Sequence, residues 1–93
     1  MRRNEKQRTT VTIYGKQYTI ISEESPEYVK DVASYVDEKM HEMKRRNPYL
    51  DTIRLAVLTS VNIADEYMKL LNEYERLLRE RERGRKAGEE ENA

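Results

Sequence analysis

Apolar residues between Asp51 and Arg83 recur at intervals of three and four, the spacing of residues that share one side of an α-helix. They form two adjacent lines along this predicted helix. One line contains Val57, Val61, Ala64, Met68, Leu71 and Leu78, with Glu75 interrupting it, and the other contains Ile63, Tyr67, Leu70, Tyr74 and Leu77. Together they make a stripe wider than a two-stranded coiled coil needs. We therefore expect this helix to pack against copies of itself.

The residues before this helix predict a β-hairpin. Residues 9–14 and 17–22 alternate, and they are rich in the β-branched and aromatic residues that favour strands. Gly15-Lys16 lies between them, and glycine at the first position of a two-residue loop suits a type II′ turn. One face of the hairpin is predicted to carry Val11, Ile13, Tyr18 and Ile20.

A shorter helix is predicted to follow the hairpin. Ser25 can cap its first turn and Pro26 suits the first helical position. The apolar stripe of this helix is expected to contain Val29, Val32, Val36, Met40 and Met43. The helix should end near Arg46, because Pro48 disfavours helical geometry at Asn47. Residues 47–49 then connect to Asp51, which is expected to cap the long helix.

The predicted fold class is α+β, a ββαα chain: an N-terminal hairpin, one medium helix and one long C-terminal helix that forms an oligomeric coiled-coil stalk. Four segments are expected. Residues 1–8 are a flexible arm, 9–60 an α/β head, 61–83 a helical stalk and 84–93 a disordered tail. Gly84 is expected to end the long helix, since glycine is common just after helix ends.

Composition narrows the possible functions. Charged residues make up 39% of the chain, the formal net charge is zero and there is no cysteine. These values argue against disulfides and against a dedicated nucleic-acid binder, which usually has a basic excess. No apolar run approaches the roughly 20 residues of a membrane span, and the start of the chain has no apolar signal segment.

No catalytic, cofactor or metal site is expected. His41 is the only histidine, and its acidic helical neighbours are more typical of a solvated surface than of a metal site. The three glycines, Gly15, Gly84 and Gly88, form no phosphate-binding loop. The chain is therefore not expected to be an enzyme.

Basic residues at the end of the shorter helix, Lys44, Arg45 and Arg46, have two interpretations. They complement the negative end of the helix dipole, or they form a docking patch for an acidic partner. Lys16, at the hairpin tip, lies near them if the hairpin packs over this helix. Asn62 also has two interpretations, a local hydrogen bond or a polar contact between two copies that fixes their register.

Two segments together resemble the ZapA family of bacterial cell-division proteins. Thr10-Val-Thr-Ile-Tyr-Gly-Lys16 is similar to the family's first strand and turn. Asn47-Pro-Tyr-Leu-Asp-Thr52, followed by residues 55–67 (LAVLTSVNIADEY), is similar to the start of its long helix. The resemblance covers about residues 9–78, and the short stalk resembles Gram-positive members.

This resemblance implies a cytoplasmic protein at the division site, the mid-cell septum. Family members bind the tubulin-like GTPase FtsZ and bundle its protofilaments, acting as dimers that can pair into tetramers. The FtsZ-binding surface is implied to lie on the head, at Lys16, Lys44, Arg45, Arg46 and Arg54. Apart from FtsZ and copies of itself, no partner is expected, neither a membrane nor nucleic acid.

The residues implied or expected at the self-association surface are Val57, Val61, Asn62, Ala64, Tyr67, Met68, Leu70, Leu71, Tyr74, Leu77 and Leu78. An alternative function from another class stays open. In it, the chain is a small helical oligomer that binds nucleic acid through the basic end of the shorter helix, which predicts strongly salt-dependent binding.

Overall fold

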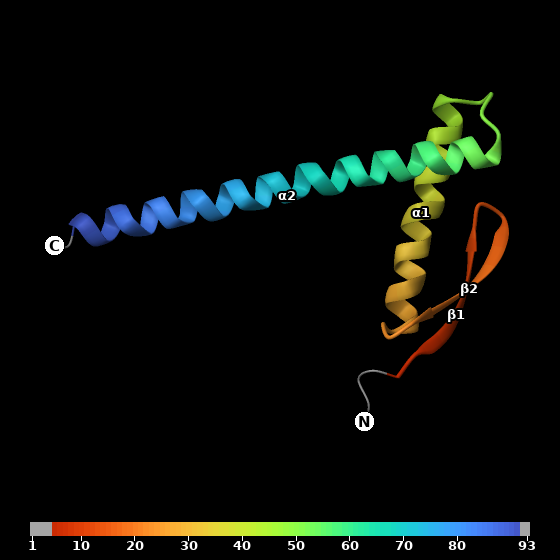
Figure 1. Cartoon of the computed structure of the whole chain (residues 1–93), viewed down its shortest axis with the longest axis horizontal. Helices are drawn as coiled ribbons and strands as arrows, with labels where there is room; N and C mark the ends of the chain where they lie inside the picture. Colours follow the sequence, from red (N-terminus) through yellow and green to blue (C-terminus); the bar gives the residue numbers. More distant parts are fainter. Residues whose placement is uncertain (1–4, 92–93) are drawn as a thin grey trace. The chain divides into compact units, whose positions relative to one another are not determined.

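The computed structural model describes residues 5–91, with side chains to residue 88. Two strands, β1 (Gln7–Ile13) and β2 (Lys16–Ser22), are followed by two helices, α1 (Pro26–Arg46) and α2 (Thr52–Glu91). Figure 1 shows the hairpin beside α1, and the connector that joins the end of α1 to the start of α2. The predicted ββαα order is confirmed. Residues 1–4 of the predicted arm lie outside the described residues, while Gln7 and Arg8, also assigned to that arm, belong to β1.

The hairpin turn differs from the expected one by a residue. Ile13 pairs with Lys16, so the two-residue loop is Tyr14-Gly15 rather than Gly15-Lys16. Both loop residues have positive φ, 50° at Tyr14 and 80° at Gly15, as a type I′ turn requires. The expectation of a type II′ turn was wrong. Tyr14 adopts a left-handed conformation, which a residue with a side chain disfavours, so the residue types did not indicate it.

Helix α1 begins as expected. The Ser25 hydroxyl accepts a hydrogen bond from the Tyr28 backbone N–H at 3.2 Å. Its buried residues are Val29, Ala33, Met40 and Met43. Val32, expected in the apolar stripe, is 47% exposed, whereas Ala33 is buried. The reason is that the hairpin covers the face of α1 that carries Val29 and Ala33. Tyr18 is likewise about half exposed, although it shares a hairpin face with buried Val11.

Two small hydrophobic clusters hold this part of the chain together. In one, Val11 of β1 packs on Val29 and Ala33 of α1. In the other, Met40 and Met43 pack around Leu55, near the start of α2. Leu55 is fully buried, so it is the point at which α1 and the first turns of α2 are fastened to each other.

Helix α2 is longer than expected, because it continues through Gly84 to Glu91. Residues 84–91, predicted as part of a disordered tail, are therefore helical. Gly84 does not adopt the positive φ of a glycine that ends a helix, since among glycines of the described chain only Gly15 has one. Each helical glycine costs about 1 kcal/mol relative to alanine, and the neighbouring Arg, Lys, Ala and Glu residues are good helix formers that offset this.

The chain divides into two compact units after Ser60. We call the first unit, up to Ser60, the head, and the second, from Val61, the stalk. The head contains both hydrophobic clusters. The stalk consists of helix α2 from Val61 onward, and most of its large apolar side chains are exposed.

Leu55→Ala should lower the free energy of unfolding by about 2–5 kcal/mol, because it leaves a cavity where α1 meets the start of α2. Urea denaturation at fixed protein concentration measures this change. Ile53→Ala is the matched control on the same helix, since Ile53 is 78% exposed and its loss should change stability little. Equal effects of the two substitutions would contradict this account of the core.

Candidate functional site

The hairpin turn of the head, which directly precedes Lys16, is held against α1 by two contacts. The Asp37 carboxylate of α1 accepts a hydrogen bond from the Tyr14 N–H at 2.6 Å. His41 adds a ring contact with Tyr14, with the ring centroids 5.1 Å apart. These contacts fasten the left-handed turn to α1, so that exposed Lys16 begins β2 from a defined position.

The three basic residues at the end of α1 have different roles. Lys44 is half-buried, and its ammonium donates hydrogen bonds to the carbonyls of Pro48, at 3.0 Å, and Leu50, at 2.9 Å. It therefore fastens the connector between the helices. Arg46 forms an ion pair with Glu42 at 3.2 Å, and Arg45 is exposed. The ammonium of Lys44 is therefore less available to bind a partner protein than the sequence suggested.

Arg54 lies in the first turn of α2. Its backbone N–H donates to the Asp51 carboxylate at 2.8 Å, which confirms Asp51 as the cap. Its guanidinium is 3.8 Å from the same carboxylate, and its side chain is 77% exposed. The guanidinium is therefore exposed to solvent, and an ion pair at the surface restrains it only weakly.

Two exposed apolar residues accompany these cations, and sequence reasoning did not assign them a role. Tyr49 in the connector is 99% exposed, and Ile53 in the first turn of α2 is 78% exposed. Tyrosine and arginine are enriched among the residues that dominate binding energy at protein interfaces. A tyrosine between two helices, next to a proline, was the signal in the sequence that could have found Tyr49.

An open, mainly apolar hollow of about 430 Å³ links the hairpin to the start of α2. Lys16 and Tyr18 line it from β2, Met40 from α1, and Thr52 and Ala56 from α2. The structure thus brings Lys16 to the same side of the head as the first turns of α2. This arrangement places Lys16 and Arg54 on elements that border one hollow.

The stalk exposes the residues expected to mediate self-association. Tyr67, Leu70 and Tyr74 are 60%, 69% and 59% exposed in the single chain. The carboxamide oxygen of Asn62 is covered but has no hydrogen-bond partner among the described residues. This oxygen does not form the local hydrogen bond considered for Asn62. A polar contact between two copies at Asn62 stays a prediction.

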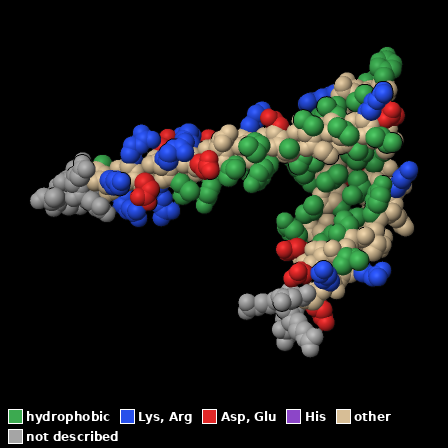
Figure 2. Space-filling model, in the orientation of Figure 1, with side chains coloured by type: hydrophobic (Ala, Val, Ile, Leu, Met, Phe, Trp, Pro, Cys, Tyr) green, Lys and Arg blue, Asp and Glu red, His purple; other side chains and the backbone are tan. Residues whose placement is uncertain are grey.

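Charge changes sign along the stalk. Residues 61–75 carry four carboxylates and one lysine, a net charge of −3, whereas residues 76–86 carry six cations and two carboxylates, a net charge of +4. Figure 2 shows apolar side chains gathered along the first part of the stalk and Lys and Arg side chains further along it. Any partner of the stalk therefore meets an acidic half and a basic half.

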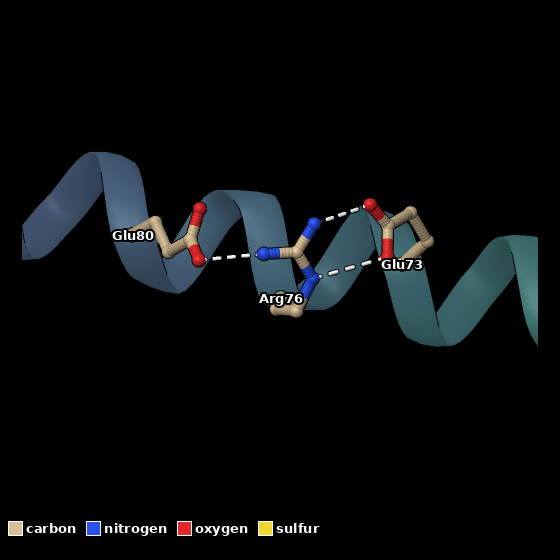
Figure 3. A network of polar contacts seen from close by, with 3 residues as sticks. All are labelled: Glu73, Arg76 and Glu80. Atoms are coloured by element: carbon tan, nitrogen blue, oxygen red, sulfur yellow. Dashed lines mark hydrogen bonds and ion pairs between the residues drawn. The ribbon is translucent and has the colours of Figure 1, made fainter.

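At the change of sign, Arg76 bridges two carboxylates of its own helix, Glu73 and Glu80 (Figure 3). The hydrogen bond from Arg76 lowers the pKa of Glu73 below its ordinary value, and the same contact raises the pKa of Arg76. Because the folded pKa of Glu73 is depressed, this contact supports the helix above the ordinary pKa and is lost as the pH falls through the lowered value.

Among described residues, no group of three His, Cys, Asp or Glu side chains is placed to hold a metal ion. None of the helices, within the same limits, is long and apolar enough to cross a membrane.

Comparison with known proteins identifies the family. The family model described as Cell division protein ZapA matches residues 9–91. The chain belongs to the ZapA family. It is 61% identical over 69 residues to the Cell division protein ZapA of Halalkalibacterium halodurans, covering 74% of this chain and 76% of that protein. It is also 60% identical over 67 residues to that of Shouchella clausii, covering 72% and 86%.

A solved structure supports both the fold and self-association. This ZapA family member matches a ZapA mutant dimer from Geobacillus stearothermophilus with a TM-score of 0.64 and 53% identity, over 78% of this chain and 85% of that one. The resemblance inferred from the two sequence segments is confirmed. The individual partner-binding and interface residues stay predictions.

Lys44→Met should lower the free energy of unfolding by about 1–3 kcal/mol, because it removes two hydrogen bonds and keeps most of the aliphatic stem. Arg45→Met removes the same charge from an exposed position and serves as the control. Chemical denaturation measures both. If the two variants unfold at the same denaturant concentration, Lys44 does not fasten the connector.

Leu71→Glu combined with Leu78→Glu should shift the protein to a smaller assembly, because four or more carboxylates would enter a packed apolar surface. Sedimentation velocity measures the mass. Asn72→Glu, a single exposed substitution on the same helix, should leave it unchanged. An unaltered mass in the Leu double variant would place self-association outside this part of the stalk.

Proposed function

We propose that this protein binds FtsZ through its head and cross-links or bundles FtsZ protofilaments at the division site, as a dimer or tetramer. Membership of a cell-division family carries the proposal, since the relatives that the chain matches are cell-division proteins. The proposed location is cytoplasmic, at the mid-cell septum, and the proposed activity is not enzymatic.

The proposed docking surface joins the cations of the head to its exposed apolar residues. Its cations are Lys16, Arg45, Arg46 and Arg54, which the resemblance implied, and Tyr49 and Ile53 are added because of their exposure. Charged residues steer an acidic filament to the head, and an aromatic anchor supplies apolar contact area. Lys44 supports this surface indirectly, by fixing the connector that carries Tyr49.

Self-association explains how a weak head site produces bundling. Each additional copy adds another docking surface, and surfaces that engage neighbouring subunits together bind far more tightly than one alone. Two copies can hold two filaments, or two subunits of one filament. The dimeric solved relative supports the required self-association.

Nucleic-acid binding through the end of α1 is less well supported. Of the three cations there, Lys44 is committed to two carbonyls and Arg46 to Glu42. Only Arg45 remains without an ion pair among described residues, and one phosphate contact supplies little affinity.

Lys16→Ala combined with Arg45→Ala should reduce the fraction of protein that co-sediments with GTP-assembled FtsZ, because two steering cations are lost while the assembly stays intact. Light scattering of the same samples reports bundling. Lys30→Ala, which removes an exposed lysine from the opposite end of α1, is the control.

Three results separate the possibilities. Co-sedimentation of the unmodified protein with increased scattering supports bundling. Co-sedimentation without it means binding without cross-linking. Absence of co-sedimentation, in a protein confirmed as an oligomer, would overturn the proposed partner, and an unaffected double variant would move the docking surface elsewhere on the head.

A further inference from the structure

Helix α1 covers one strand of the hairpin more than the other. Val11 of β1 is buried against Val29 and Ala33 of α1, whereas no residue of β2 is fully buried. Tyr18, which is paired with Val11 and shares its face of the sheet, is 49% exposed. The inner face of the sheet, the one that faces the helices, is therefore covered at β1 and open at β2.

The outer edge of β2 carries unpaired backbone groups. The sheet has two strands, so β2 has a neighbour on one side only. Residues of an antiparallel pair alternate between those bonded to the partner strand and those whose N–H and C=O point away from it. Ile13 and Lys16 close the two-residue turn as a bonded pair, so the outward groups of β2 belong to Gln17, Thr19 and Ile21. Among the described residues, none of these outward groups takes part in a hydrogen bond outside the hairpin.

This edge lacks the features that usually block strand addition. Proteins protect exposed edges with proline, with several charged residues or with a bulge. Strand β2 contains no proline, Lys16 is its only charged residue, and its register with β1 has no bulge. The edge is therefore a template to which another extended segment can add as a third strand.

The open hollow of the head lies where side chains of such a third strand would point. Side chains that continue the inner face of the sheet would come beside Lys16, Tyr18 and Ile20, which all line the hollow. Met40 of α1 and Ala56 of α2 line it as well. Figure 1 shows the turn end of the hairpin toward the start of α2. An apolar side chain of the added strand therefore finds a mainly apolar site of about 430 Å³ next to it.

The charge around the hollow selects the kind of segment. Lys16 is the one charged residue among those of the described chain that line the hollow. Arg54, whose side chain is 77% exposed, follows Thr52 of the lining by two residues. A carboxylate of the occupant would be attracted by both cations, and a lysine or arginine would be repelled. The hollow and its cations thus fit a segment that combines apolar and acidic residues.

The edge of β1 is less suited to the same segment. The hollow beside it, of about 290 Å³, is lined mainly by polar residues, Thr10, Thr12, Lys30 and Ser34. An apolar side chain placed there would take hydroxyl groups and an ammonium out of water, which is unfavourable. The edge of β1 therefore serves as an internal control for the edge of β2.

We propose that the head binds an extended segment of its partner protein by strand addition to the outer edge of β2. An apolar side chain of the segment occupies the hollow, and an acidic residue lies beside Lys16. This inference rests on the proposed binding of FtsZ by the head, and it gives that binding a mode. Backbone hydrogen bonds and the apolar anchor supply the affinity, while Lys16 selects the charge of the segment.

Amide hydrogen exchange of the full chain tests the edge directly. In the protein alone, the N–H groups of Gln17, Thr19 and Ile21 should exchange rapidly, because they are unpaired. FtsZ filaments assembled with a slowly hydrolysed GTP analogue should slow this exchange by about tenfold or more. The outward N–H groups of Thr10 and Thr12 on β1 should keep their rates. Mass spectrometry of peptides from this chain, with fragmentation to single residues, measures both edges in one sample.

The possible results separate this inference from the proposed function. Protection confined to other parts of the head, in a protein that co-sediments with filaments, would overturn strand addition and leave FtsZ binding intact. Slow exchange at the edge of β2 without filaments would show that another copy already occupies it, which also overturns the inference. Absence of co-sedimentation would overturn both.

Thr19→Pro gives a second test with a matched control. Proline removes the outward N–H at the centre of β2 without removing a bond to β1, a position that strands tolerate. Co-sedimentation with FtsZ should show binding weakened by about threefold to tenfold. Thr10 is paired with Thr19, so Thr10→Pro makes the same change on the edge of β1 and should leave binding unchanged. Equal effects of the two substitutions on binding would overturn the inference.

Ala56→Leu tests the anchor without changing the strand. Leucine fills part of the hollow and is a good helix former, so the head should stay folded. Binding to FtsZ filaments should weaken by about tenfold or more, the contribution of one buried apolar side chain. Ala56→Ser, which adds little volume at the same position, is the control, and circular dichroism and sedimentation check the fold and the assembly of each variant. Unchanged binding by a folded Ala56→Leu protein would show that the hollow holds no anchor and would overturn the inference.

Discussion

The apolar surface of helix α2 is the constraint on which the rest of this structure depends. A single chain cannot cover it, because the head uses only the first turns of the helix, around Leu55, and the stalk has no second element of its own. Tyr67, Leu70 and Tyr74 therefore remain more than half exposed. Burial of such surface is the main favourable term in association, so the stable form of this chain is an assembly.

The head is small, and its polar contacts compensate for a limited core. Two clusters of a few residues each hold the hairpin and helices. Asp37 fastens the turn, Ser25 and Asp51 cap the helices, and Lys44 fastens the connector. These contacts have a functional consequence, since they fix the positions from which Lys16, Tyr49 and Arg54 reach solvent.

The head and the stalk of this cell-division family member carry different kinds of surface. The head offers cations and an exposed tyrosine, whereas the stalk offers apolar lines and opposite charges at its two halves. In the proposed function, binding and assembly therefore depend on different residues. Substitutions can separate the two properties, and each can be measured without the other.

The sequence by itself determined the order of elements, the caps of both helices, the apolar lines of the long helix and the family, because these depend on local spacing and on short segments such as residues 10–16 and 47–52. Only the tertiary structure decided that the turn is Tyr14-Gly15, that Lys44 is a fastening residue and that α2 continues through its glycines. The turn and Lys44 depend on partners distant in the chain or on backbone geometry, which residue types do not specify. The glycines illustrate the same limit, since a residue that commonly ends helices does so only when its backbone turns left-handed, and favourable neighbours kept it helical here.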